Sequence, residues 1–341
     1  MTSYPHEFDD GALDDKAVLV RHDEVLRGLA LTGARIRLET AAAAALHLDY
    51  DLQPRGIVVT GLESRLIRAV IEFTCPAPLV AWPYGGLPGW AGPLDLVVVQ
   101  ASGSDDAGLH TTVMEAARRG CAMLVAAPAV GAIDEYLPGR GVTKVVTATN
   151  DPVAAVVALL DVLSRAGLGP AIVAESIAEA ADMVAEECSP HRDLSSNPAK
   201  SAAIALADGQ PLVWGGSMLA ARAARRIAEE MRRITGRGAL AAPASDLAPL
   251  LLAAGLSDPF ADPGEQPARP VLISLDDGDD SAAAGRDRVM LENIAEARQL
   301  RVVRMVCDDA QAGPVGCHVA LLQQGLYAAA YLGVGLDRVA G

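Results

Sequence analysis

Apolar residues in the chain occur in two kinds of run that alternate along most of its length. Short continuous runs rich in Val, Ile and Leu, such as "LDLVVVQ" at 94–100, are typical of strands buried on both faces. Between these runs, apolar residues recur three to four positions apart, which is the spacing of a helix that buries one face. Apolar strands that alternate with helices predict a parallel sheet covered by helices on both sides.

The alternation occurs twice along the chain, so the pattern predicts two similar halves. In the first half we expect strands at 57–60, 79–82, 94–100, 121–128 and 143–148, with helices near 64–73, 107–119 and 151–164. In the second half we expect strands at 211–214, 269–275 and 301–306, with helices at 197–207, after 217, at 286–300 and at 319–336. The glycine turns after Gly61 and Gly215 occupy equivalent places in the two halves, which favours an internal duplication.

Two further helical regions complete the predicted organisation. A long region from Lys16 to Leu48 has apolar residues at helix spacing, and a bridging helix is expected from Ala174 to Cys188. The fold class is therefore α/β, with two doubly wound, flavodoxin-like domains that each hold a parallel sheet flanked by helices. The predicted parts are an N-terminal helical segment (1–50), a first domain (51–165), a helical linker (166–196) and a second domain with the C-terminal helix (197–341).

The stretch "PLVWGGSMLAARAARRI" (211–227) has a pattern that suits an anionic ligand. A short apolar strand is broken by Gly215, Gly216 and Ser217, and an Ala- and Arg-rich helix follows. A strand that turns through small residues into a helix directs free backbone N–H groups at whatever lies above the turn. The sequence therefore predicts an anion-binding turn at these three residues.

Net charge limits the partners. The 341 residues include 43 Asp and Glu against 28 Lys and Arg, which gives a formal charge of −15. Such a field repels nucleic acid and anionic membrane, so neither is an expected partner. An anionic small ligand would need a local device, such as a helix N-terminus, to bind.

The cysteines and the apolar runs indicate a cytoplasmic protein. The five cysteines are widely spaced without a Cys-x-x-Cys pair, which is typical of reduced thiols and predicts neither a disulfide framework nor a metal site. The acidic start is unlike a signal peptide, and the apolar run at 319–336 is short for a membrane span. The acidic run 276–280 lacks the spacing of a calcium loop and is expected to be a solvated turn.

Several segments resemble a known family. The segment "NPAKSAAIALADGQPLVWGGSMLAARAARR" (197–226) resembles the second half of the bifunctional phosphoglucose/phosphomannose isomerases, which are built from two sugar isomerase (SIS) domains. The segment at 84–103 is similar to the part of that family that leads to its phosphate loop, and 327–337 is similar to its last helix. The matching residues of the first segment are Asn197, Pro198, Ala199, Lys200, Pro211, Trp214, Gly215, Ser217, Leu219, Ala220, Arg225 and Arg226.

The resemblance implies aldose–ketose isomerisation of a six-carbon sugar phosphate, but the catalytic positions differ. Where the family has its glutamate base, this chain has Arg233, which cannot accept a proton because its pKa is too high. Pro249 stands near the place of the family's histidine, and Val153 stands in place of its arginine. No catalytic residue, metal or cofactor is therefore expected.

The resemblance also implies a phosphosugar site that has changed. Its expected residues are Ser102, Gly103 and Ser104 in the phosphate loop, Gly61 and Ser64 in the first glycine turn, and Gly215, Gly216 and Ser217 in the second. The loop continues with Asp105 where the family has threonine. An aspartate beside a phosphate dianion is repulsive. We therefore expect weak binding of a hexose phosphate or a related anionic sugar.

These observations favour a homodimeric phosphosugar-binding protein that has lost isomerase activity and has a regulatory or scaffold role in sugar phosphate metabolism. One alternative is an active isomerase with relocated catalytic groups, for which Glu229 and Glu230 are the nearest candidates for the base. A second alternative is a structural dimer partner that binds no ligand. The sequence leaves both alternatives open.

Overall fold

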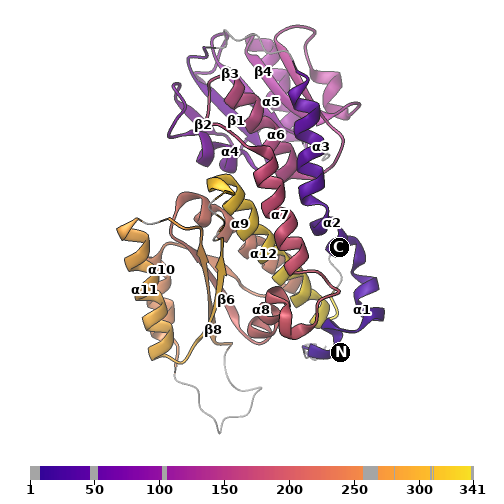
Figure 1. Cartoon of the computed structure of the whole chain (residues 1–341). Helices are drawn as coiled ribbons and strands as arrows, with labels where there is room; N and C mark the ends of the chain where they lie inside the picture. Colours follow the sequence, from indigo (N-terminus) through magenta and orange to yellow (C-terminus); the bar gives the residue numbers. More distant parts are fainter. Residues whose placement is uncertain are drawn as a thin grey trace, which may run out of the picture. The chain divides into compact units, whose positions relative to one another are not determined.

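A computed structural model of the chain describes residues 8–46, 53–101, 106–255, 268–279, 281–307, 309 and 311–338. The chain forms two compact units (Figure 1). One unit holds residues 32–179, and the other holds the residues up to 31 together with those from 180 onward. The boundary between the units thus falls inside the bridging helix α7 (Ala174–Glu187), and the N-terminal helices are likewise divided between the two units.

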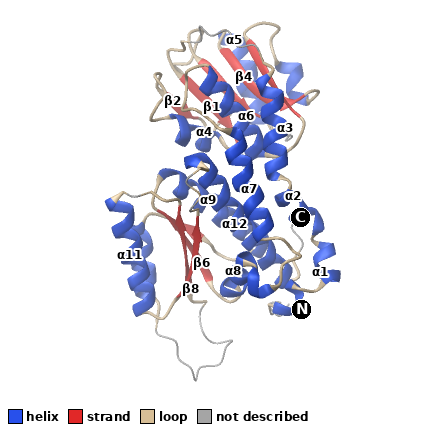
Figure 2. Ribbon diagram, viewed as in Figure 1, coloured by secondary structure: helices blue, strands red, loops and turns tan. Residues whose placement is uncertain are grey.

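The unit of residues 32–179 is built on a five-stranded parallel sheet in the order β2-β1-β3-β4-β5. Its strands are β1 (Ile57–Gly61), β2 (Leu79–Ala81), β3 (Leu96–Gln100), β4 (Ala122–Pro128) and β5 (Val142–Thr147). Every residue of β3 is buried, as its uninterrupted apolar run predicts. Figure 2 shows the strands of this sheet in red among blue helices.

Helices cover both faces of the first sheet. On one face, α5 (Ala107–Arg119) packs its Leu109 and Val113 onto Val97, Val99 and Val125 of the strands. The helices α3 (Thr32–Ala44), α4 (Ser64–Ile71) and α6 (Pro152–Arg165) belong to the other layer, where α3 packs along α6 and α6 along β3. This is the doubly wound α/β arrangement that the sequence predicts.

The second unit is built on a four-stranded parallel sheet in the order β7-β6-β8-β9. Its strands are β6 (Gln210–Gly215), β7 (Leu240–Ala241), β8 (Pro270–Asp276) and β9 (Arg301–Val306). Helices α10 (Ala244–Ala253) and α11 (Ala282–Ala297) pack on Leu212, Trp214 and Leu272 on one face. Helices α8 (Pro198–Leu206), α9 (Met218–Thr235) and α12 (Gly313–Gly335) pack together as a second layer, with α9 against β6.

The two sheets share one topology. In each, the first strand of the half (β1 or β6) lies between a short second strand and the third strand, so β1, β2, β3 and β4 correspond to β6, β7, β8 and β9. The turns at Gly61 and Gly215 therefore occupy equivalent places, as the sequence predicts. No described residue of the second sheet forms a counterpart of β5.

The helical region expected from Lys16 to Leu48 consists of three helices, α1 (Lys16–Arg21), α2 (Asp23–Ala30) and α3, and its last two residues lie outside the described residues. The helices are separated at His22, whose backbone angles lie outside the helical region, and at Leu31, the C-cap of α2. The short strand β7 and the helix α10 were not expected from the sequence.

The expectation of reduced cysteines is wrong for one pair. Cys307 and Cys317 form a disulfide with their Cα atoms 5.3 Å apart, whereas Cys75, Cys121 and Cys188 are free thiols. The fold places the two residues within bonding range because Cys307 directly follows β9 and Cys317 lies early in the helix that returns from it. Among the described helices, none is both long and apolar enough to cross a membrane.

Candidate functional site

The switch point of the first sheet lies between β1 and β3. From β1 the chain goes to β2 on one side, and then returns to form β3 on the other side. In open α/β sheets, ligands bind beyond the carboxyl ends of the strands at this point, because the loops diverge there and leave room. The residues at this place are the end of β1, the start of α4 and the end of β3.

Gly61 brings the first turn directly against the end of β3. Its φ is +111°, and a Cβ atom at this position would lie 2.2 Å from the carbonyl oxygen of Gln100. Only glycine fits both conditions. The backbone N–H of Glu63 also donates a hydrogen bond to Oε1 of Gln100, at 3.1 Å. The turn from Gly61 to Ser64 is thereby fastened to the third strand.

Ser64 is buried and opens α4 beside this contact. The predicted phosphate loop, Ser102, Gly103, Ser104 and Asp105, lies outside the described residues. Its two flanks are described: β3 ends at Gln100, and α5 begins at Ala107 with Asp106 as its N-cap, whose carboxylate accepts from the N–H of Gly108 at 2.8 Å. The structure thus places Gly61 and Ser64 beside the strand that leads into the predicted loop.

The equivalent turn of the second sheet is tightly built. Gly215 ends β6, and a Cβ there would lie 2.4 Å from the backbone of Ala220; a Cβ on Gly216 would lie 2.7 Å from Cβ of Ala284. Ser217 is the N-cap of α9, where its Oγ accepts from the N–H of Ala220 at 2.9 Å. Close packing therefore requires the two glycines, and Ser217 supplies the helix cap.

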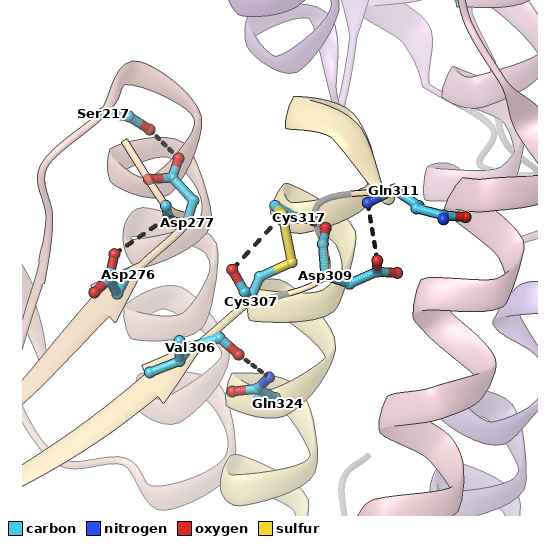
Figure 3. The surroundings of a disulfide bond; sticks show 10 residues. Ser217, Asp276, Asp277, Val306, Cys307, Asp309, Gln311, Cys317 and Gln324 are labelled. Atoms are coloured by element: carbon cyan, nitrogen blue, oxygen red, sulfur yellow. Dashed lines mark hydrogen bonds between the residues drawn. A yellow bond between two sulfur atoms is a disulfide. The ribbon is translucent and has the colours of Figure 1, made fainter. Parts of the chain in front are cut away.

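Asp277 changes the chemistry of this second turn. It directly follows β8, and its carboxylate accepts a short hydrogen bond from Oγ of Ser217 (Figure 3). The hydroxyl that the sequence predicts as an anion ligand is therefore already bound to an acidic group. A phosphate at this turn would meet a negative charge. The sequence signal was the acidic run at 276–280, which becomes informative once its place at the carboxyl end of β8 is known.

The positions that correspond to the catalytic residues of the resembled isomerases all lie in helices. Arg233 lies in the last turn of α9, where its guanidinium is 2.5 Å from the carboxylate of Glu230. Pro249 lies inside α10. Val153 lies in the first turn of α6, where its N–H donates to the carboxylate of the N-cap Asp151 at 2.9 Å.

The two candidates for a relocated base, Glu229 and Glu230, are both held in ion pairs with arginines. Glu229 pairs with Arg226 at 2.7 Å, and Glu230 pairs with Arg233, both within α9. They lie twelve and thirteen residues after Ser217. At 1.5 Å per residue, this places them about 18–20 Å along the helix from the turn. They are ion-paired residues remote from the carboxyl edge of their own sheet.

The segment that carries the resemblance has a structural role. Asn197 is the N-cap of α8, and its Oδ1 accepts from the N–H groups of Ala199 and Lys200 at 3.0 and 3.1 Å. Its side-chain amide donates to the carbonyl of Ser189 at 3.0 Å. The sequence predicts the cap but not the burial of Lys200, whose side chain is fully enclosed.

No family model and no curated protein matches the sequence. Solved structures do match the fold. The C-terminal domain of glucosamine-fructose-6-phosphate aminotransferase from Francisella tularensis superposes with a TM-score of 0.66 at 11% identity, over 92% of this chain and 96% of that one. Tagatose-6-phosphate ketose/aldose isomerase from Escherichia coli gives 0.61 at 12% identity, over 95% and 93%. A glucose-6-phosphate isomerase like protein from Thermus thermophilus gives 0.55 at 16% identity, over 94% and 92%.

These neighbours identify the architecture. They are proteins of the SIS class, and the likeness extends over both halves of this chain. The chain therefore has the α/β fold with two SIS-type parallel sheets flanked by helices. At these low identities the likeness concerns the fold alone.

Proposed function

We propose that this protein binds a hexose phosphate or a related anionic sugar at the carboxyl edge of its first sheet. The observation that carries the proposal is the contact between Gly61 and Gln100. It sets the turn before α4 against the strand that leads to Ser102, Gly103 and Ser104, at the switch point of the sheet. The resemblance implies a phosphate loop at these same positions.

Charge and helix geometry set the strength of binding in this proposal. The N-termini of α4 and α5 both follow strands of this edge, and helix N-termini favour anions by about 0.3–1 kcal/mol when exposed. Asp105 and Asp106 oppose this, and the carboxylate of Asp106 already caps α5. Binding is therefore weak, and weaker still at the second turn, where Asp277 holds Ser217.

We further propose that the bound sugar is not isomerised. The three positions that carry the family's base, histidine and arginine hold Arg233, Pro249 and Val153, and the nearest carboxylates, Glu229 and Glu230, are ion-paired. Isomerisation needs a base within reach of the acidified C–H and a fixed positive charge near the oxyanion. Neither is supplied by these residues, which favours a regulatory or scaffold role.

Calorimetric titration tests the binding proposal. Fructose 6-phosphate, glucose 6-phosphate and mannose 6-phosphate are titrated into the protein, with the corresponding free hexoses as controls. We expect heat from a phosphorylated sugar and none from the free hexoses. An absence of heat with every phosphorylated sugar at millimolar concentration would contradict the proposal and favour a structural role without a ligand.

An isomerase assay tests the catalytic half separately. Fructose 6-phosphate incubated with the protein should yield neither glucose 6-phosphate nor mannose 6-phosphate above the uncatalysed rate. Loss of a positioned base alone costs about a hundred- to ten-thousand-fold in rate. Turnover of about 1–1000 per second would show that an active base exists elsewhere.

Assembly is a further part of the proposal. The resemblance implies a homodimer, and exposed apolar residues such as Phe73 and Val130 in the first unit could be covered by a second chain. Light scattering should give twice the chain mass of 35.2 kDa. A monomer at micromolar concentration would contradict this.

A further inference from the structure

A disulfide joins the last strand of the second unit to its last helix (Figure 3). Cys307 directly follows β9, and Cys317 is the fifth residue of α12, ten positions later. Both side chains are buried, with exposed fractions of 7% and 5%. The crosslink therefore fixes the start of α12 to the carboxyl end of β9.

The crosslinked residues also adjoin the glycine turn of the second sheet. The backbone N–H of Cys307 donates to the carbonyl of Asp276 at 2.9 Å. The next residue, Asp277, accepts from Oγ of Ser217, which caps α9. Two hydrogen bonds thus connect the disulfide to the N-cap of α9 through one short acidic segment.

Helix α12 makes a second contact with the same place. His318, the neighbour of Cys317, is buried, and its ring Nδ1 lies 2.9 Å from the carbonyl oxygen of Leu219. Leu219 is the second residue of α9. The start of α12 is therefore held covalently to β9 and by a hydrogen bond to α9. A shift of the start of α12 would therefore reach the Gly215–Ser217 turn by two routes, through Asp277 and through Leu219.

The Cys317 sulfur has two carbonyl oxygens nearby. The carbonyl oxygens of Cys307 and Asp309 each lie 4.0 Å from Sγ of Cys317. A thiol at Cys317 is a weak donor, and these two carbonyls are acceptors already in place. Opening the disulfide therefore leaves the Cys317 thiol with acceptors at hand.

The two buried free cysteines do not compete for exchange with this pair. Burial raises the pKa of the Cys188 thiol to about 12, and burial raises the pKa of Cys121 as well. Since the thiolate is the attacking species, these two buried thiols are inert near neutral pH. Exchange at the Cys307–Cys317 pair therefore calls for an external thiol, which must reach sulfurs that are themselves buried.

We propose that Cys307 and Cys317 form a reversible thiol–disulfide switch that fixes or releases the start of α12, and so sets the order of the Gly215–Ser217 turn. In the opening step a dithiol reductant attacks one sulfur of the disulfide and forms a mixed disulfide. Its second thiol then displaces the protein sulfur. The reductant is oxidised to a disulfide, and two electrons and two protons convert the pair to two thiols. A low-molecular-weight disulfide reverses the step.

Thiol counting and hydrogen exchange on the same protein test the switch without any sugar. Oxidised protein is divided, and one half is treated with dithiothreitol without denaturant. Alkylation after unfolding should find three thiols in the untreated half and five in the reduced half, because two of the five cysteines are paired. Peptides covering 213–221 and 313–322 should exchange roughly tenfold faster or more after reduction.

Matched variants and an internal control complete the design. Cys317→Ser should show the hydrogen exchange of the reduced protein whether or not dithiothreitol is added. Cys75→Ser should still respond to dithiothreitol, because it removes a free thiol outside the pair. Peptides covering 57–71 in the other sheet should not change. Five alkylated thiols in the untreated half, resistance of the folded protein to dithiothreitol, or equal exchange of 213–221 in both states would each overturn the proposal.

Discussion

The ammonium group of Lys200 lies 2.7 Å from the carboxylate of Asp14, a residue 186 positions earlier in the chain. The ammonium group also donates to the carbonyl oxygens of Pro190 and Arg192, at 3.3 and 2.8 Å. Each of the three ammonium N–H groups therefore has an acceptor. The lysine of the Asn-Pro-Ala-Lys segment fastens α8 to the N-terminal segment and to the turn before it.

Replacing Lys200 by methionine should destabilise the protein. The change removes a fully buried charge and leaves two carbonyl oxygens without a donor, while Asp14 can turn to solvent because half of its side chain is exposed. We expect a loss of about 2–3 kcal/mol in the free energy of unfolding, measured in urea. Lys16→Met, at an exposed position of α1, should change it by less than about 0.5 kcal/mol. Equal losses in the two variants would contradict the assignment.

The same pair predicts a dependence of stability on pH. The hydrogen bond from Lys200 lowers the pKa of Asp14 below its ordinary value of 3.8, and burial opposes this only in part. A carboxyl group whose pKa is lowered by folding stabilises the protein fully above its unfolded pKa, and this contribution is lost as the pH falls through the folded pKa.

The stability difference between the parent and Asp14→Asn should therefore be constant from about pH 5 to 7 and should shrink below about pH 4. Urea unfolding at a series of pH values measures it. A difference that persists unchanged at pH 3 would show that Lys200 does not depend on a charged Asp14.

Gly61→Ala tests the contact that defines the proposed site. The substitution places a Cβ within 2.2 Å of the Gln100 carbonyl at a φ of +111°, so the turn must move. We expect a loss of about 2 kcal/mol or more in unfolding free energy, together with loss of sugar phosphate binding. Gly131→Ala, in the same unit, has extended backbone and no atom within 4 Å of the new Cβ, so it should be close to neutral. Binding retained by Gly61→Ala would place the ligand elsewhere.

Two charge-removing variants distinguish the two glycine turns. Asp105→Thr introduces the threonine that the resembled isomerases have in the first loop. It should tighten hexose phosphate binding by about threefold to tenfold, because one nearby carboxylate contributes about as much as a helix terminus. Asp277→Asn removes the carboxylate beside Ser217 and should leave the affinity unchanged. Calorimetric titration of both variants measures this. Tighter binding by Asp277→Asn alone would move the site to the second sheet.

The fold could be predicted well where local signals are strong. The apolar run at β3 and the Asn197–Pro198 cap predict their elements closely. A continuous apolar run marks a strand buried on both faces, and Asn followed by Pro marks a capped helix start. The strand β7 could not be predicted, because two residues carry no period. The breaks at His22 and Leu31 were also missed, since neither residue is a typical helix breaker.

The candidate site could be predicted only in part. Glycine and serine at strand ends point to the two turns, but the sequence does not reveal which turn faces a carboxylate. Asp277 reaches Ser217 across 60 positions, and only the pairing of β6 with β8 brings them together. The pairing of Cys307 with Cys317 likewise depends on a helix that returns along its own strand.

Among the described strands, β9 lies at an edge of the four-stranded sheet, and strands of other chains can pair with such edges. The side-chain amide of Gln324, on α12, donates to the carbonyl of Val306 at the end of this strand at 2.9 Å. One backbone acceptor of the edge is thereby already occupied. Through Gln324, α12 thus withholds one of the acceptors that a strand of another chain would use to pair with β9.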